Sequence, residues 1–175
     1  MDTFSLEPVF DKIRRVHTDP PHELIAIDTV AQRLHFIGGN IIRQSFTVST
    51  SRFGIGNREG SNMTPLGLHR VIEKIGSGAP PGRIFRDRLD TGIDWHPGLT
   101  EDNLILTRII RLEGLEDGIN RGPGIDTYGR YIYIHGTNRE DQIGTPLSHG
   151  CICMTNHDII ELFDMTTEGT LVFID

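Results

Sequence analysis

The feature that most constrains the fold is a succession of short runs rich in isoleucine, valine, phenylalanine and threonine. Glycine, asparagine, serine and proline separate these runs, and the chain contains 20 glycines. Short β-branched and aromatic runs bounded by turn residues are typical of β-strands. Many strands with few helices predict a mostly-β sandwich or barrel-like domain with one or two short helices. We expect strands over residues 24–28, 33–37, 41–48, 66–76, 104–112, 131–135 and 169–175.

The N-terminal segment has a different pattern. Its apolar residues recur at helical spacing from Leu6 to Val16, and Pro20-Pro21 ends the segment. We therefore expect residues 1–21 to form a helical extension lying on one catalytic domain, residues 22–175.

A second short helix is expected over residues 155–163, because Thr155 and Asp158 have the spacing of a capping box. Residues 77–103 have few periodic apolar positions. They are interpreted as a long irregular insertion with one short strand at Ile84-Phe85, and long loops of this kind are often functional.

Composition excludes several classes of function. The net charge of -7 and the pI of about 5.6 argue against a nucleic-acid partner, which requires a basic face. No apolar run reaches the roughly 18 residues of a membrane span. The charged N-terminus does not resemble a secretion signal, so a cytoplasmic location is expected. The alternative is a periplasmic protein from which a signal peptide has been removed.

The chemistry-bearing stretch is Ser-His-Gly-Cys-Ile-Cys-Met, residues 148–154. If the segments around His135 and Cys151 pair as neighbouring strands, the imidazole can act as a base for the thiol. Gly150 permits a sharp bend, and the N–H groups around it could bind an oxyanion.

Other interpretations of these residues remain. Cys151 could be an inert buried residue. Cys151, Cys153, His149 and His135 could bind zinc, but their spacing is not that of zinc motifs, and we expect no metal and no cofactor. A disulfide between the two cysteines is disfavoured, because strand residues two apart lie roughly 6.6 Å from each other.

Two stretches together, Ile-His-Gly-Thr-Asn at 134–138 and the Ser-His-Gly-Cys-Ile-x-Met stretch, resemble the catalytic signature of the L,D-transpeptidase family with its YkuD-type domain. The resemblance extends over about residues 22–175 and implies a YkuD-type β-sandwich. It implies that Cys151 is the nucleophile, His135 the base, and the Gly136 carbonyl the group that orients the imidazole. It further assigns oxyanion and substrate contacts to Thr137, Asn138, Ser148, His149 and Gly150.

The resemblance also implies the reaction. The thiol attacks the carbonyl of the diamino acid, normally diaminopimelate, at position three of a peptidoglycan stem tetrapeptide, and D-alanine leaves. The thioester passes to an amine, giving a 3→3 crosslink, or to water, giving a tripeptide. Because a cytoplasmic enzyme meets soluble muropeptides, an L,D-carboxypeptidase in peptidoglycan recycling is favoured. The alternatives are an L,D-transpeptidase and, remotely, an inactive cell-wall-peptide-binding domain.

One position departs from the family pattern. Where Cys153 stands, relatives usually carry arginine or asparagine, and an arginine there is expected to support the site or a substrate carboxylate. Cysteine cannot do this, so substrate or acceptor recognition is expected to differ.

Overall fold

The computed structural model describes residues 5–16, 21–100 and 102–175. Within these ranges the chain forms two α-helices, α1 (Glu7–Val16) and α2 (Asn156–Met165), and a 3-10 helix, η1 (Glu140–Gln142). Ten strands make the fold mostly β, as predicted. They are β1 (Glu23–Asp28), β2 (Arg33–Gly38), β3 (Ile41–Thr47), β4 (Gly67–Ile75), β5 (Arg83–Arg86), β6 (Leu89–Asp94), β7 (Ile105–Gly114), β8 (Tyr133–Gly136), β9 (Ile152–Met154) and β10 (Leu171–Ile174).

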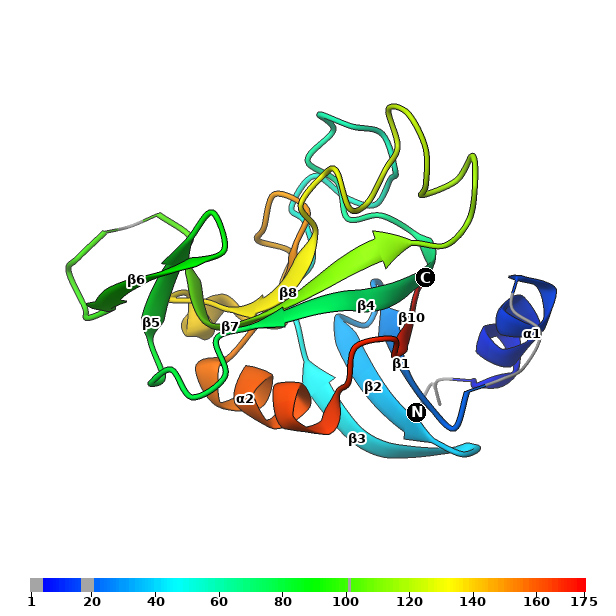
Figure 1. Cartoon of the computed structure of the whole chain (residues 1–175), viewed down its shortest axis with the longest axis horizontal. Coiled ribbons are helices and arrows are strands. Elements are labelled where there is room, and N and C mark those ends of the chain that lie inside the picture. The colour runs from blue at the N-terminus through cyan, green and yellow to red at the C-terminus, as the bar shows by residue number, and fades with distance from the viewer. Residues whose placement is uncertain (1–4, 17–20, 101) are drawn as a thin grey trace.

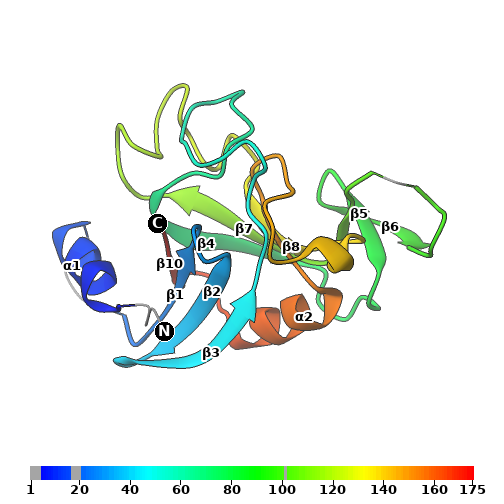
Figure 2. The same ribbon diagram turned by 180° about the vertical axis from the view of Figure 1, so that it is seen from behind.

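The strands join one mixed sheet. Its main path runs β3-β2-β1-β10-β4-β7-β5-β6, and β8 pairs with both β7 and β9. The last strand, β10, lies parallel to β1 and antiparallel to β4, so the first and last strands are neighbours inside the sheet (Figure 1). Long loops rise from the edge of the sheet near β8 (Figure 2).

The alternation of side chains along the strands builds a core on each face of the sheet. In β1, Ile25 and Ile27 point to the larger core, and Leu24 and Ala26 point to the smaller one. Helix α2 covers the larger core and helix α1 covers the smaller one, so the helices lie on opposite faces. The helix residues buried there are Ile159, Leu162 and Phe163 of α2 and Val9 and Ile13 of α1.

The helices follow local signals in the sequence. Thr155 caps α2, because its hydroxyl accepts a hydrogen bond from the Asp158 N–H at 3.1 Å. Helix α1 ends at Val16, and Pro20, which was expected to end that segment, lies outside the described residues. Neither described helix is long and apolar enough to cross a membrane.

The interpretation of residues 77–103 as an irregular insertion with one short strand missed a second strand. The predicted strand at Ile84-Phe85 exists as β5, but β6 pairs with it to form a hairpin that continues the sheet beyond β7. The sequence hides this hairpin for two reasons. The residues of β6 are mostly exposed, so they lack an alternating apolar pattern. The turn residues Asp87 and Arg88 adopt left-handed φ values of 48° and 67° without the glycine or asparagine that usually marks such turns.

Candidate active site

Strands β8 and β9 bring the predicted catalytic segments together. They pair in parallel, and the register aligns His135 with Cys153 and Gly136 with Met154. Parallel neighbours cannot be joined by a tight turn, so residues 137–151 form the crossover between them. This loop contains η1 and ends at Cys151, directly before β9.

The imidazole of His135 is buried and held in one orientation. Its Nδ1 lies 2.7 Å from the carbonyl oxygen of Gly136, as the family resemblance implied. Nδ1 therefore carries the proton, and the lone pair of Nε2 is free to accept one. Burial lowers the pKa of His135 to about 4, so the ring is a neutral base near neutral pH.

The Gly136 position is restricted by its surroundings. A Cβ atom there would lie 2.6 Å from Oδ1 of Asn156 and 2.7 Å from the carbonyl oxygen of Leu106. Only glycine fits between α2 and β7 at this point. The carbonyl that orients His135 is thus fixed by packing.

The Cys151 thiol is half-buried at the end of the crossover loop. Its Sγ lies 3.4 Å from the Tyr133 N–H and 3.6 Å from the Tyr131 carbonyl oxygen. Burial raises the pKa of Cys151 to about 11, and the Tyr133 N–H and the Arg130 charge oppose this only in part. The resting thiol is therefore neutral, and becoming a nucleophile requires proton transfer to a base.

The second cysteine lies closer to the base than was expected. Cys153 is fully buried, and its Sγ lies 3.9 Å from Nε2 of His135 and 3.8 Å from Nδ2 of Asn103. Burial and the neighbouring Cys151 raise the pKa of Cys153 to about 12. The two thiols differ in solvent access, because Cys151 lines an open pocket and Cys153 does not.

That pocket has a volume of about 370 Å³ and contains both predicted catalytic side chains. A second pocket of about 340 Å³ adjoins it and shares Asp102, Asn103 and His149. The remaining residues of the first pocket are Ile105, His135, Ser148 and Cys151, and those of the second are Arg52, Arg139, Gln142, Pro146 and Leu147.

The predicted oxyanion segment is tightly bent. Gly150 has a φ of +129°, and a Cβ there would lie 3.1 Å from Cδ1 of Ile132. Its N–H donates to the Ser148 hydroxyl at 3.2 Å, and that hydroxyl donates to the Cys151 carbonyl oxygen at 2.5 Å. The His149 side chain is positioned by a residue outside this segment, because its Nε2 lies 2.9 Å from a guanidinium nitrogen of Arg52.

Thr137 and Asn138 were expected to contact the oxyanion or the substrate, but neither lines the two pockets. The Thr137 hydroxyl donates to Oδ1 of Asn103 at 2.7 Å. Oδ1 of Asn138 accepts the Leu104 N–H at 2.8 Å, and its Nδ2 donates to the Asp102 carbonyl oxygen at 2.8 Å. Both residues thus fasten segment 102–104 beside the thiol. That segment was missed, because its hydrogen bonds to Thr137, Asn138 and Cys153 span 34 positions or more.

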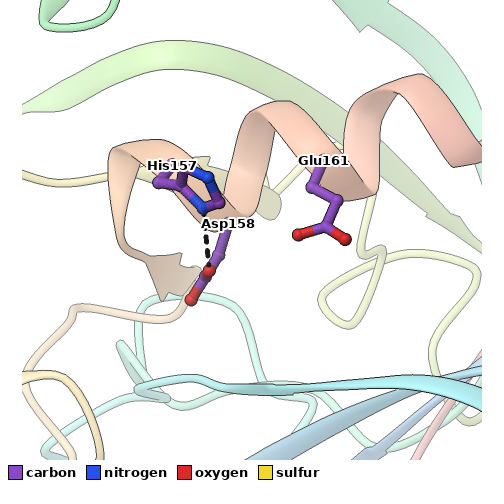
Figure 3. A group of neighbouring side chains, drawn as sticks. All are labelled: His157, Asp158 and Glu161. Carbon is purple, nitrogen blue, oxygen red and sulfur yellow. Dashed lines mark ion pairs between the residues drawn. The ribbon is translucent and has the colours of Figure 1, made fainter.

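Among the described residues, the side chains grouped closely enough to hold a metal ion lie elsewhere, on helix α2. The potential ligand atoms of His157, Asp158 and Glu161 lie within 4.8 Å of one another (Figure 3). The ion pair between His157 and Asp158, at 3.5 Å, already accounts for part of this grouping. His135, His149, Cys151 and Cys153 do not converge in this way.

Comparison with known proteins connects this geometry to a family. The model of the YkuD L,D-transpeptidase catalytic domain matches residues 22–174. The probable L,D-transpeptidase YcfS of Escherichia coli (strain K12) is 30% identical over 163 residues, which cover 89% of this chain and 45% of that protein. The putative L,D-transpeptidase YqjB of Bacillus subtilis (strain 168) is 48% identical over 48 residues, 27% of each chain.

Solved structures show the same fold. An L,D-transpeptidase from Mycobacterium smegmatis has a TM-score of 0.52 at 15% identity, covering 88% of this chain and 58% of that one. The L,D-transpeptidase LdtMt1 in complex with imipenem has a TM-score of 0.54 at 16% identity, covering 88% and 59%. The chain therefore spans less than two thirds of each of these four proteins. From the family match over residues 22–174, the chain belongs to the YkuD family of L,D-transpeptidase catalytic domains.

Proposed function

We propose that this chain is a cysteine acyltransferase that attacks the bond between the diamino acid and D-alanine of a peptidoglycan stem tetrapeptide, with Cys151 as nucleophile. The supporting observation is that Cys151 and a neutral His135 line one pocket, with Nε2 of the imidazole unprotonated. Nothing in this chemistry requires a cofactor.

The proposed first half-reaction follows from the protonation states. The neutral thiol passes its proton to Nε2 of His135 as the sulfur attacks the carbonyl carbon of the diamino acid. Substrate binding is proposed to bring the two groups together, because in the resting structure Nε2 of His135 lies 3.9 Å from Sγ of Cys153. His135 then returns the proton to the leaving amine of D-alanine, and a thioester on Cys151 remains.

The second half-reaction is proposed to be hydrolysis, which makes the enzyme an L,D-carboxypeptidase acting on soluble muropeptides. The partial exposure of Cys151 supports this, because water can reach the thioester from the open pocket. We likewise propose that the protein works in the cytoplasm, where muropeptides return for recycling. Fractionation of cells that express the full gene tests the location separately from the reaction.

One observation favours L,D-transpeptidation as the second candidate. The adjoining pocket meets the thiol pocket at Asn103 and His149 and could hold an acceptor peptide while the donor occupies the thiol pocket. An amine bound there would compete with water for the thioester, and the product would be a 3→3 crosslink.

Product analysis by mass spectrometry tests both candidates. The protein is incubated with a stem tetrapeptide, with and without an equal concentration of a second stem peptide. Tripeptide and D-alanine as main products in both mixtures support hydrolysis, whereas 3→3 dimers as the main product with the second peptide establish the transpeptidase. Cys151→Ala and His135→Ala should each abolish turnover with an unchanged circular dichroism spectrum. Wild-type release of D-alanine by Cys151→Ala would rule out the mechanism.

A further inference from the structure

An unusual arrangement of arginine and tyrosine side chains lies beside Cys151, next to residues that do not line its pocket. Tyr131, whose carbonyl oxygen contacts the thiol, is 53% exposed and has a φ of +56°. A large non-glycine residue rarely adopts this conformation, which costs about 1 kcal/mol or more and is enriched at functional sites. The fold thus maintains an exposed aromatic ring in a strained position beside the nucleophile.

Arg88, at the tip of the β5–β6 hairpin, places its positive charge near this ring. Arg88 is half-buried, its guanidinium carbon lies 5.0 Å from the centre of the Tyr131 ring, and its NH1 donates to the Tyr133 hydroxyl at 3.1 Å. No carboxylate of the described residues lies within ion-pair distance of Arg88. Its remaining N–H groups are thus available to an anionic group.

A second guanidinium strengthens the positive charge. Arg111 is buried beneath the same surface, 3.8 Å from the Tyr128 ring centre and 5.4 Å from that of Tyr131. Its Nε has no hydrogen-bond partner, and its ion pair with the half-exposed Glu73 is long, at 3.5 Å. The two arginines thus share one long ion pair, that of Arg111 with Glu73, and the charge of the exposed Asp87 also acts on Arg88.

We propose that Arg88 and Tyr131 form a subsite that binds a carboxylate of the peptide substrate next to Cys151. The inference rests on the proposed function, which supplies a substrate with two candidate carboxylates, on the side chain of the diamino acid and at the C-terminus of D-alanine. Arginine binds a carboxylate bidentately, and the Tyr131 ring gives the adjoining apolar atoms a surface to pack on.

Paired donor peptides test the subsite. Three tetrapeptides are compared, one with both carboxylates free, one with the side-chain carboxylate amidated, and one with the C-terminal carboxylate amidated. For wild type, kcat/KM should fall about tenfold when the bound carboxylate is amidated, which corresponds to about 1.4 kcal/mol. The amidated peptide that shows this fall identifies the carboxylate.

For Arg88→Gln, the ratio of kcat/KM for the peptide with both carboxylates free to kcat/KM for that amidated peptide should fall close to one. Arg88→Lys should restore part of the wild-type ratio. The matched control is Arg86→Gln, on the same hairpin but exposed and lining a different pocket with Ile84, Thr91 and Leu99, and it should keep the wild-type ratio. Tyr131→Asn removes the ring but tolerates the left-handed backbone, and it should lower kcat/KM for every donor.

Failure of the subsite and failure of the proposed function give different results. If wild type turns over the peptides but Arg88→Gln changes neither ratio, the subsite is wrong and the proposed function stands. If wild type releases no D-alanine from any donor and no adduct forms on Cys151, the proposed function itself fails.

Discussion

The buried histidine His69 should make the protein lose stability in mild acid. Its ring is fully buried in β4, with Nδ1 3.0 Å from the Gly67 carbonyl oxygen and Nε2 3.0 Å from the Thr127 hydroxyl. Nε2 also faces the amide nitrogen of Asn120 at 3.4 Å. A proton on Nε2 would therefore face the Asn120 amide donor in a fully buried site. Burial lowers the pKa of His69 to about 4.

The direction and size of the change in unfolding free energy follow from the different proton binding of the folded and unfolded states. In the unfolded chain a histidine has a pKa of about 6.5, so between about pH 6.5 and 4 the unfolded state binds more protons than the folded state. The free energy of unfolding is undiminished above this window and falls as the pH drops through it. The full loss is about 3 kcal/mol, of which about 2 kcal/mol is already gone at pH 5. A domain of ordinary stability has only about 5–15 kcal/mol.

The assay is urea unfolding followed by circular dichroism at pH 7.5, 6.5, 5.5 and 5.0, for wild type and His69→Gln. The variant is expected to be less stable at pH 7.5 but to lose about 2 kcal/mol less than wild type on going to pH 5. His157→Gln, at an exposed position on α2, should lose as much as wild type. Equal losses for wild type and His69→Gln would refute the reasoning, because the variant lacks only this titrating group.

Three further predictions concern the site and the two helices. Because burial raises the pKa of Cys151 to about 11, its alkylation rate in the free protein should keep rising with pH beyond 9; a plateau near pH 7 would indicate a thiolate–imidazolium pair instead. Thr155→Ala should cost about 1 kcal/mol of unfolding free energy through loss of the α2 cap, whereas Thr155→Ser should cost little, as measured by urea unfolding. Lys12→Met should cost about 2 kcal/mol, because it leaves the carboxylate of Glu116, whose side chain is 5% exposed, without its 2.6 Å ion pair; an unchanged urea midpoint would contradict this.

The mostly-β class and the family signature could be predicted because both are local in the sequence. Strand residues such as Ile25 and Ile27 carry their pattern within a few positions, and Thr155 caps α2 through a contact three residues away. His135, Gly136 and Cys151 could be predicted as site residues because they lie in short, specific motifs, and their catalytic roles stay predictions. The orientation of the imidazole by the Gly136 carbonyl follows from adjacent residues and was also expected.

Tertiary structure decided what depends on strand register and on long-range contacts. The register of β8 and β9 aligns His135 with Cys153, and the pairing of two strands cannot be read from either strand alone. The β5–β6 hairpin stayed hidden because its exposed residues carry no periodic pattern, yet it brings Arg88 to Tyr133 across 45 positions of sequence. Asn103 reaches Cys153 across 50 positions in the same way. The sequence by itself determined which groups are capable of the chemistry, and only packing decided which of them touch and which of them solvent can reach.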